Sequence, residues 1–133
     1  MADVDWSAAL ADPGPVRRVL GSPPPPLTDF DLTSVLVDER RTSVTLRFFA
    51  FLVPSAAAHL WQERRHNAVE FTLVCTGVAG FAVDGWSGYP MTTATLTPRT
   101  GSVALAGRGM QITFTATGFH AEAPAGHLAS HSQ

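Results

Sequence analysis

The side chains that could do chemistry in this sequence are one cysteine, five histidines and a scatter of carboxylates. Nucleophilic catalysis needs a Ser or Cys beside a base that a third group orients. Cys75 shares the apolar phase of the alternating segment 69–75, which predicts a packed and inert thiol. The run Gly85-Trp86-Ser87-Gly88 lacks the spacing of a Gly-x-Ser-x-Gly nucleophile elbow. We therefore expect no nucleophilic site.

Paired-acid and metal chemistry are no better supported. Glycoside hydrolysis needs two convergent carboxylates, whereas Asp84 fits a turn and Glu70 fits the solvated face of a strand. His127 and His131 have the i, i+4 spacing of helical ligands, but the Gly, Ala and Ser around them do not favour a helix. No Cys-x-x-Cys pair and no Gly-rich phosphate loop is present. The sequence predicts no catalytic residue, no metal site and no cofactor, and hence no enzyme.

Length, composition and charge describe one ordered domain. The chain has 133 residues, of which 45% are apolar and 15% charged, so it is too hydrophobic for intrinsic disorder. All nine basic residues are Arg, and the formal net charge is −2. Because a nucleic-acid binder normally carries a basic excess, we expect no nucleic-acid partner.

Cysteine usage and hydropathy bear on the compartment. The single Cys75 cannot form an intramolecular disulfide. The first residues include Asp3 and Asp5 and no apolar signal-peptide core, and no apolar run approaches the roughly 18 residues of a transmembrane helix. We expect a cytoplasmic protein with no membrane partner.

The elements that must position these residues begin with a helical segment. Residues 1–22 carry it, because Asp5 or Ser7 can cap a first turn and Pro15 can open a second. A Pro-rich spacer follows at 23–28, where four consecutive prolines favour a stiff, extended chain.

From Phe30 onward the apolar period changes to two, the period of a strand. Residues 30–37 and 44–48 predict a hairpin with one buried face, on which Leu32 and Leu36 would share a side. A third strand is predicted at 69–75, and residues 78–83 are expected to pair back on it. The remaining candidate strands are 91–97, 102–106, 110–117 and 119–123.

These elements predict a mainly β fold. We expect an antiparallel sandwich or open barrel of about eight short strands with a short N-terminal helical segment. Residues 1–123 would form this single β-rich domain, and residues 124–133 would form a disordered tail.

Aromatic and acidic residues are the candidates for binding. Trp86 follows an Asp-Gly turn, where a large ring is expected to cap the core. Seven of the eleven acidic residues lie within the first 39 positions. Such an asymmetry can steer a basic partner, and it can equally be a solvated edge. Since hairpin turns and strand starts are exposed, the candidate partner-binding residues are Asp29, Asp31, Asp38 and Glu39, with Trp61 as an aromatic candidate.

Several short motifs follow one another in an order that is typical of one protein family. They are Trp6 to Leu20 before the Pro-rich linker, Ser43-Val44-Thr45-Leu46-Arg47-Phe48, Trp61-Gln62, Asn67-Ala68-Val69-Glu70-Phe71-Thr72-Leu73 and Gly85-Trp86-Ser87. In this order they resemble the immunity protein 50 family, from bacterial polymorphic toxin systems, over residues 6–123. The chain departs from that pattern at residues 49–53, which are apolar where a polar, acidic loop is usual.

The resemblance implies binding rather than turnover. An immunity protein blocks a cognate toxin by covering its active site or a neighbouring surface, so the implied partner is a toxin domain and no catalytic residues carry over. If that toxin is a nuclease, its basic cleft would complement an acidic inhibitor. The alternative is a small-ligand-binding β-barrel or sandwich, because apolar strand faces can line a pocket as readily as fill a core.

Overall fold

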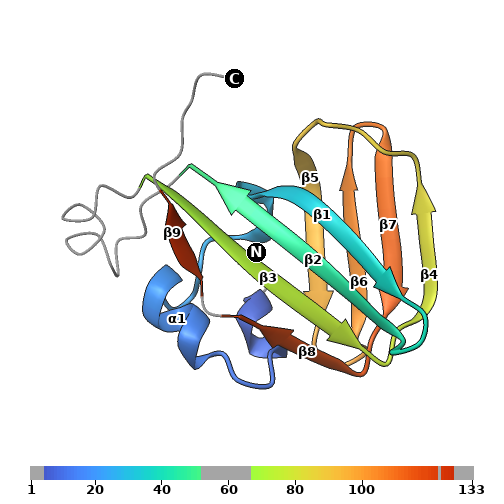
Figure 1. Cartoon of the computed structure of the whole chain (residues 1–133), viewed down its shortest axis with the longest axis horizontal. Coiled ribbons are helices and arrows are strands. Elements are labelled where there is room, and N and C mark those ends of the chain that lie inside the picture. The colour runs from blue at the N-terminus through green and yellow to red at the C-terminus, as the bar shows by residue number, and fades with distance from the viewer. Residues whose placement is uncertain (1–4, 52–66, 123, 128–133) are drawn as a thin grey trace.

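Two antiparallel sheets make up most of the structure (Figure 1), a computed structural model that describes residues 5–51, 67–122 and 124–127. The strands of sheet A are β1 (Asp31–Asp38), β2 (Ser43–Ala50), β3 (Ala68–Thr76), β8 (Gly118–Ala121) and β9 (Ala125–His127). Those of sheet B are β4 (Ala79–Asp84), β5 (Met91–Thr97), β6 (Ser102–Gly107) and β7 (Met110–Thr115). The predicted mainly β, antiparallel fold is confirmed.

The order of the strands makes the fold a sandwich. Sheet A has the order β1-β2-β3-β8, with β9 also paired to β3, and sheet B has the order β4-β7-β6-β5. Among the described residues no strand pair joins the two sheets, so no barrel closes. The strands of sheet A run obliquely to those of sheet B (Figure 1).

One apolar core fills the space between the sheets. As the period of two predicts, alternate residues of each strand face it. The register places Phe48 opposite Phe71 in sheet A and Leu105 opposite Ile112 in sheet B, and all four are buried. Cys75 lies on the same face of β3 and is fully buried.

The short helices at the N-terminal end pack onto this core. They are η1 (Trp6–Ala9), α1 (Gly14–Leu20) and η2 (Leu27–Asp29), of which η1 and η2 are 3-10 turns. The Trp6 ring stacks on Phe71 at 5.2 Å between ring centroids, while Phe48 and Phe30 contact the same Phe71 ring at 5.1 and 5.0 Å. The Trp6 Nε1–H is satisfied by the carbonyl of Pro25 at 2.8 Å. Trp6 therefore plugs the core as a buried ring.

A small polar cluster ties η1 to α1. Asp5 caps η1 by accepting from the Ser7 backbone N–H, and Arg17 donates to both Ser7 Oγ (2.9 Å) and Asp5 Oδ2 (3.1 Å). Burial alone would raise the pKa of Asp5, but the hydrogen bonds from Ser7 and the charge of Arg17 outweigh it and lower that pKa. The carboxylate is thus charged at neutral pH and holds the two turns together.

The strand β4 does not pair as predicted. Residues 78–83 were expected to form a hairpin with β3, but β4 pairs with β7 in the other sheet. Both edges of β3 are already taken, one by β2 and the other by β8 and β9. After Gly77 the chain therefore crosses between the sheets, where the Val78 N–H donates to the Thr42 carbonyl at 2.8 Å.

The strand β1 also departs from the predicted alternation. Its register with β2 shifts between Leu32 and Ser34, as a β-bulge does. The extra residue changes which side chains face inward, so Leu32 faces the core but Leu36 faces outward. The prediction that these two leucines share one face is wrong for this reason.

The C-terminal end contributes one short strand. Within the segment 124–133, for which no structure was expected, residues 125–127 form β9 and pair with residues 68–70 of β3. No helix within the described ranges is long and apolar enough to cross a membrane.

Candidate functional site

Exposed apolar side chains gather on one side of the sandwich. The described residues carry six large hydrophobic side chains that are exposed, and five of them lie on β1, on β4 or in the loop that follows β4. We call this surface the β1–β4 opening and define it by four of those five residues, Val37, Val83, Trp86 and Tyr89; the fifth, Leu36, lies on β1 but faces the outer side of sheet A. Such a gathering marks an interaction surface more often than scattered exposed residues do.

The opening exists because the two sheets do not cover each other along β1 and β4. Val37 pairs with the buried Val44, and Val83 pairs with the buried Ile112, so both valines point to the core side of their sheets. They are nevertheless 46% and 47% exposed. The edge of the core is therefore open to solvent between β1 and β4.

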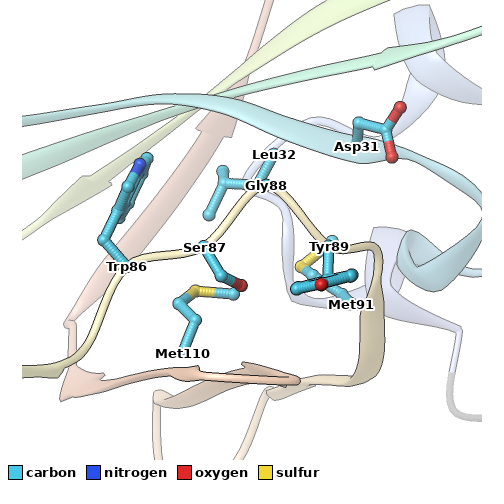
Figure 2. Close-up of a pocket in the computed structure, with 8 residues that line it drawn as sticks. All are labelled: Asp31, Leu32, Trp86, Ser87, Gly88, Tyr89, Met91 and Met110. Carbon is cyan, nitrogen blue, oxygen red and sulfur yellow. The ribbon is translucent and has the colours of Figure 1, made fainter.

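A hollow lies at one end of the opening, where β1 begins (Figure 2). Its volume is about 170 Å³, and Leu32 of β1 and Met110 of β7 line it together with the loop after β4. In Figure 2 Trp86 and Asp31 lie at opposite ends of the hollow. A cavity for a drug-sized ligand has roughly 300–1,000 Å³, so this hollow suits a single side chain.

The loop that carries Trp86 packs against the β6–β7 turn, which holds it in place. Ser87 Oγ donates to the carbonyl of Arg108, and the Arg108 guanidinium carbon lies 4.9 Å from the centre of the Tyr89 ring. Gly85 has φ +77°, and a Cβ there would lie 2.3 Å from the Gly109 carbonyl oxygen. Trp86 is thus 61% exposed on a loop whose neighbours are held in place, which is the arrangement of a preorganised contact residue.

A second hollow lies at the other end of β1. Val37, Asp38 and Glu39 line it from the first hairpin, and Phe81 lines it from β4. It is a shallow groove that is open to solvent. Asp38 is half-buried there, and its Oδ1 accepts from the backbone N–H of Arg40 and of Arg41.

The acidic residues proposed from the sequence are divided between the two ends of β1. Asp31 lines the first hollow, whereas Asp38 and Glu39 line the second. Asp29 is exposed on η2, two residues before Asp31. The structure therefore does not gather all four in one cluster, and whether they contact a partner stays a prediction. Trp61 lies outside the described residues.

The sequence reasoning missed the aromatic part of this surface. Trp86 was expected to cap the core, but its ring is mostly exposed. The available signal was the composition of residues 85–90, in which two glycines and a proline surround Trp86 and Tyr89. A loop of that composition follows a strand edge more readily than it enters a core.

No arrangement for catalysis appears among the described residues. Burial raises the pKa of the Cys75 thiol to about 12, so it is protonated at neutral pH and inert. Glu70 on β3 and Asp84 on β4 belong to different sheets. In the part of the chain that the structure describes, no three His, Cys, Asp or Glu side chains converge on a point that could hold a metal ion.

The sequence matches a known protein family. A family model described as immunity protein 50 matches residues 12–127. No curated protein and no solved structure matches the chain.

Proposed function

The chain belongs to the immunity protein 50 family, and from that premise we propose that it binds a cognate bacterial toxin and neutralises it by forming a complex. The action is stoichiometric and involves no turnover. We place it in the cytoplasm of the bacterium that makes the toxin, where the inhibitor protects its own cell.

The observation that carries this proposal is the family match, which spans most of the chain. The described surface supports it. Trp, Tyr and Arg are the residue types that dominate the binding energy of protein interfaces. Trp86 and Tyr89 lie together on the β1–β4 opening, and Arg108 lies over the Tyr89 ring. The sandwich behind them has a filled core, so little conformational entropy is lost when the surface binds.

The candidate contact surface is the β1–β4 opening with the acidic residues at its two ends. We propose that Asp31, Asp38 and Glu39 lie at the rim, where charges mainly set the association rate. Asp29 and Trp61 remain candidates on the sequence argument alone.

The test uses the product of the gene beside this one, which the proposal expects to carry a toxin domain. We expect a bacterial host that produces that domain to stop growing and to grow again when this chain is co-expressed. The purified pair should form a complex of one copy each, and the activity of the toxin should fall linearly to zero at an equimolar ratio. Full toxin activity in the presence of excess folded protein would contradict the proposal.

A further inference from the structure

The free edge of β1 is the least protected strand edge of the sandwich. An exposed edge presents unpaired backbone N–H and C=O groups and readily accepts another strand, so proteins usually cover or interrupt it. The edge strands β5, β8 and β4 are each covered or interrupted. β5 lies against η1 and η2, and the Phe119 carbonyl of β8 accepts from the Ala11 N–H at 2.9 Å. β4 is interrupted by a register shift between Ala79 and Ala82.

The edge of β1 is less protected, because its own register shift, between Leu32 and Ser34, lies near the start of the strand and leaves the rest regular. β1 pairs with β2 alone, and no other described segment forms backbone hydrogen bonds along its free side. Beyond the bulge, residues 34–38 keep a regular register with β2. Five regular residues span about 17 Å at roughly 3.3 Å per residue, which is long enough to pair with an added strand.

Apolar side chains flank this edge on both sides. Leu36 is 62% exposed on the outer side of sheet A. On the inner side, the edge borders the β1–β4 opening with Val37 and Val83. A segment paired with β1 would therefore bury apolar side chains on both of its own faces, as a strand inserted at the rim of a sandwich does.

We propose that the toxin binds by an extended segment that adds to β1 as a new edge strand and places one Lys or Arg side chain in the hollow between Asp31 and Trp86. This inference rests on the proposed function and names the kind of segment that the toxin contributes. The methylene stem of a basic side chain suits Trp86 and Leu32, which line the hollow. Asp31 lies next to Leu32 at the open end, but its register partner Phe49 faces the outer side of sheet A, so the charged group would meet the Asp31 carboxylate at the rim of the hollow and not inside it.

The charges around the opening favour a basic partner segment over a second copy of this chain. Antiparallel pairing of two β1 strands would bring Asp31 of one copy towards Asp38 and Glu39 of the other, and like charges opposed across strands are unfavourable. Three arginines also lie near the opening. Arg108 is held over the Tyr89 ring, and Arg40 and Arg41 lie in the turn after β1. Arg40 and Arg41 offset Asp38 and Glu39 at one end of the opening, whereas at the other end Arg108 alone is held against Tyr89, so we place the basic contact at Asp31.

The first experiment is hydrogen–deuterium exchange of the full chain, alone and with the purified toxin domain encoded beside it. Strand addition should slow exchange by at least about 10-fold at those amides of residues 34–38 that point away from β2, and should leave residues 93–97 of β5 unchanged. Binding without protection of residues 34–38 overturns this inference and leaves the proposed function intact. Absence of any binding overturns both.

The second experiment measures the affinity of variants for the same domain. Leu36→Lys and Trp86→Ala should each weaken binding by at least about 30-fold, the factor that corresponds to a hot-spot residue, and Asp31→Lys should weaken it by at least about 5-fold, mainly through a lower association rate. The control for Leu36→Lys is Thr97→Lys, which adds the same single positive charge to an exposed strand position on the far edge of sheet B and should leave affinity unchanged.

Each variant is first checked for wild-type thermal unfolding, and the exchange experiment, which needs no substitution, decides the matter if one of them fails to fold. Unchanged affinity in the three folded variants overturns the inference. So does a concentration-dependent dimer of the free chain in which residues 34–38 are protected, because the occupant would then be a second copy.

Discussion

At the scale of single residues, two aromatic rings show how differently one residue class is used here. Phe71 lies at the centre of the core, with Trp6, Phe30 and Phe48 in contact with its ring. Trp86 lies at the β1–β4 opening, where most of its ring is in contact with solvent. The Phe71 ring can therefore contribute only to the stability of the fold, whereas the Trp86 ring can contact a partner protein.

This contrast gives a prediction about stability. Phe71→Ala should lower the free energy of unfolding by about 3–5 kcal/mol, because it leaves a cavity among three other rings. Trp86→Ala should lower it by less than about 1 kcal/mol, because the side chain is mainly exposed. Urea-induced unfolding of both variants measures the difference. Equal losses in the two variants would show that the Trp86 ring is packed in solution.

At the scale of elements, the loop of residues 85–90 depends on one glycine and tolerates change at another. Gly85 has a positive φ and lies against the Gly109 backbone, so Gly85→Ala should destabilise the protein by more than about 1 kcal/mol and displace the Trp86 loop. Gly88 has no atom within 4 Å of the position of a Cβ, which makes Gly88→Ala the matched control. Thermal unfolding and the tryptophan fluorescence spectrum report the two effects. A Gly85→Ala variant that matches wild type in both would contradict the assigned backbone conformation.

The elements also show which features could be predicted from the sequence. β3 was predicted well because both of its edges are paired, so Val69, Phe71 and Leu73 alternate strictly with half-buried residues. The face of Leu36 was predicted wrongly because a bulge changes the phase of alternation without leaving a clear mark in residue types. The partner of β4 was missed because pairing depends on which edges are free, which is a property of the whole sheet.

The candidate site was predictable only in part for the same physical reason. Charges such as Asp31 and Glu39 are expected at the surface from their type alone, and the structure finds both exposed. An exposed Trp86 is not expected from its type, since it depends on where the two sheets fail to cover each other. Val37 and Val83 are exposed although they face the core side of their sheets. Alternation predicts that core-side residues are buried, so it could not predict this exposure.

At the scale of the whole molecule, the distribution of charge matters more than its sum. The formal net charge is only −2, but seven of the eleven acidic residues lie in the first 39 positions. Of these, Asp31, Asp38 and Glu39 lie at the two ends of the β1–β4 opening. A field of this kind attracts a basic partner before contact and accelerates association, an effect that salt screens.

The last prediction concerns this steering. Neutralising Asp29, Asp31 and Asp38 to Asn and Glu39 to Gln moves the formal net charge from −2 to +2. The fold should persist, because an Asn at position 38 retains the Oδ1 that accepts from the Arg40 and Arg41 N–H groups. The association rate with the neighbouring toxin domain should fall by about 10-fold or more at low salt and become less dependent on salt concentration.

Stopped-flow mixing at several salt concentrations measures both quantities. An unchanged rate at low salt, with full protection of the host cell, would mean that these four carboxylates are ordinary solvated side chains and that aromatic and apolar groups carry recognition.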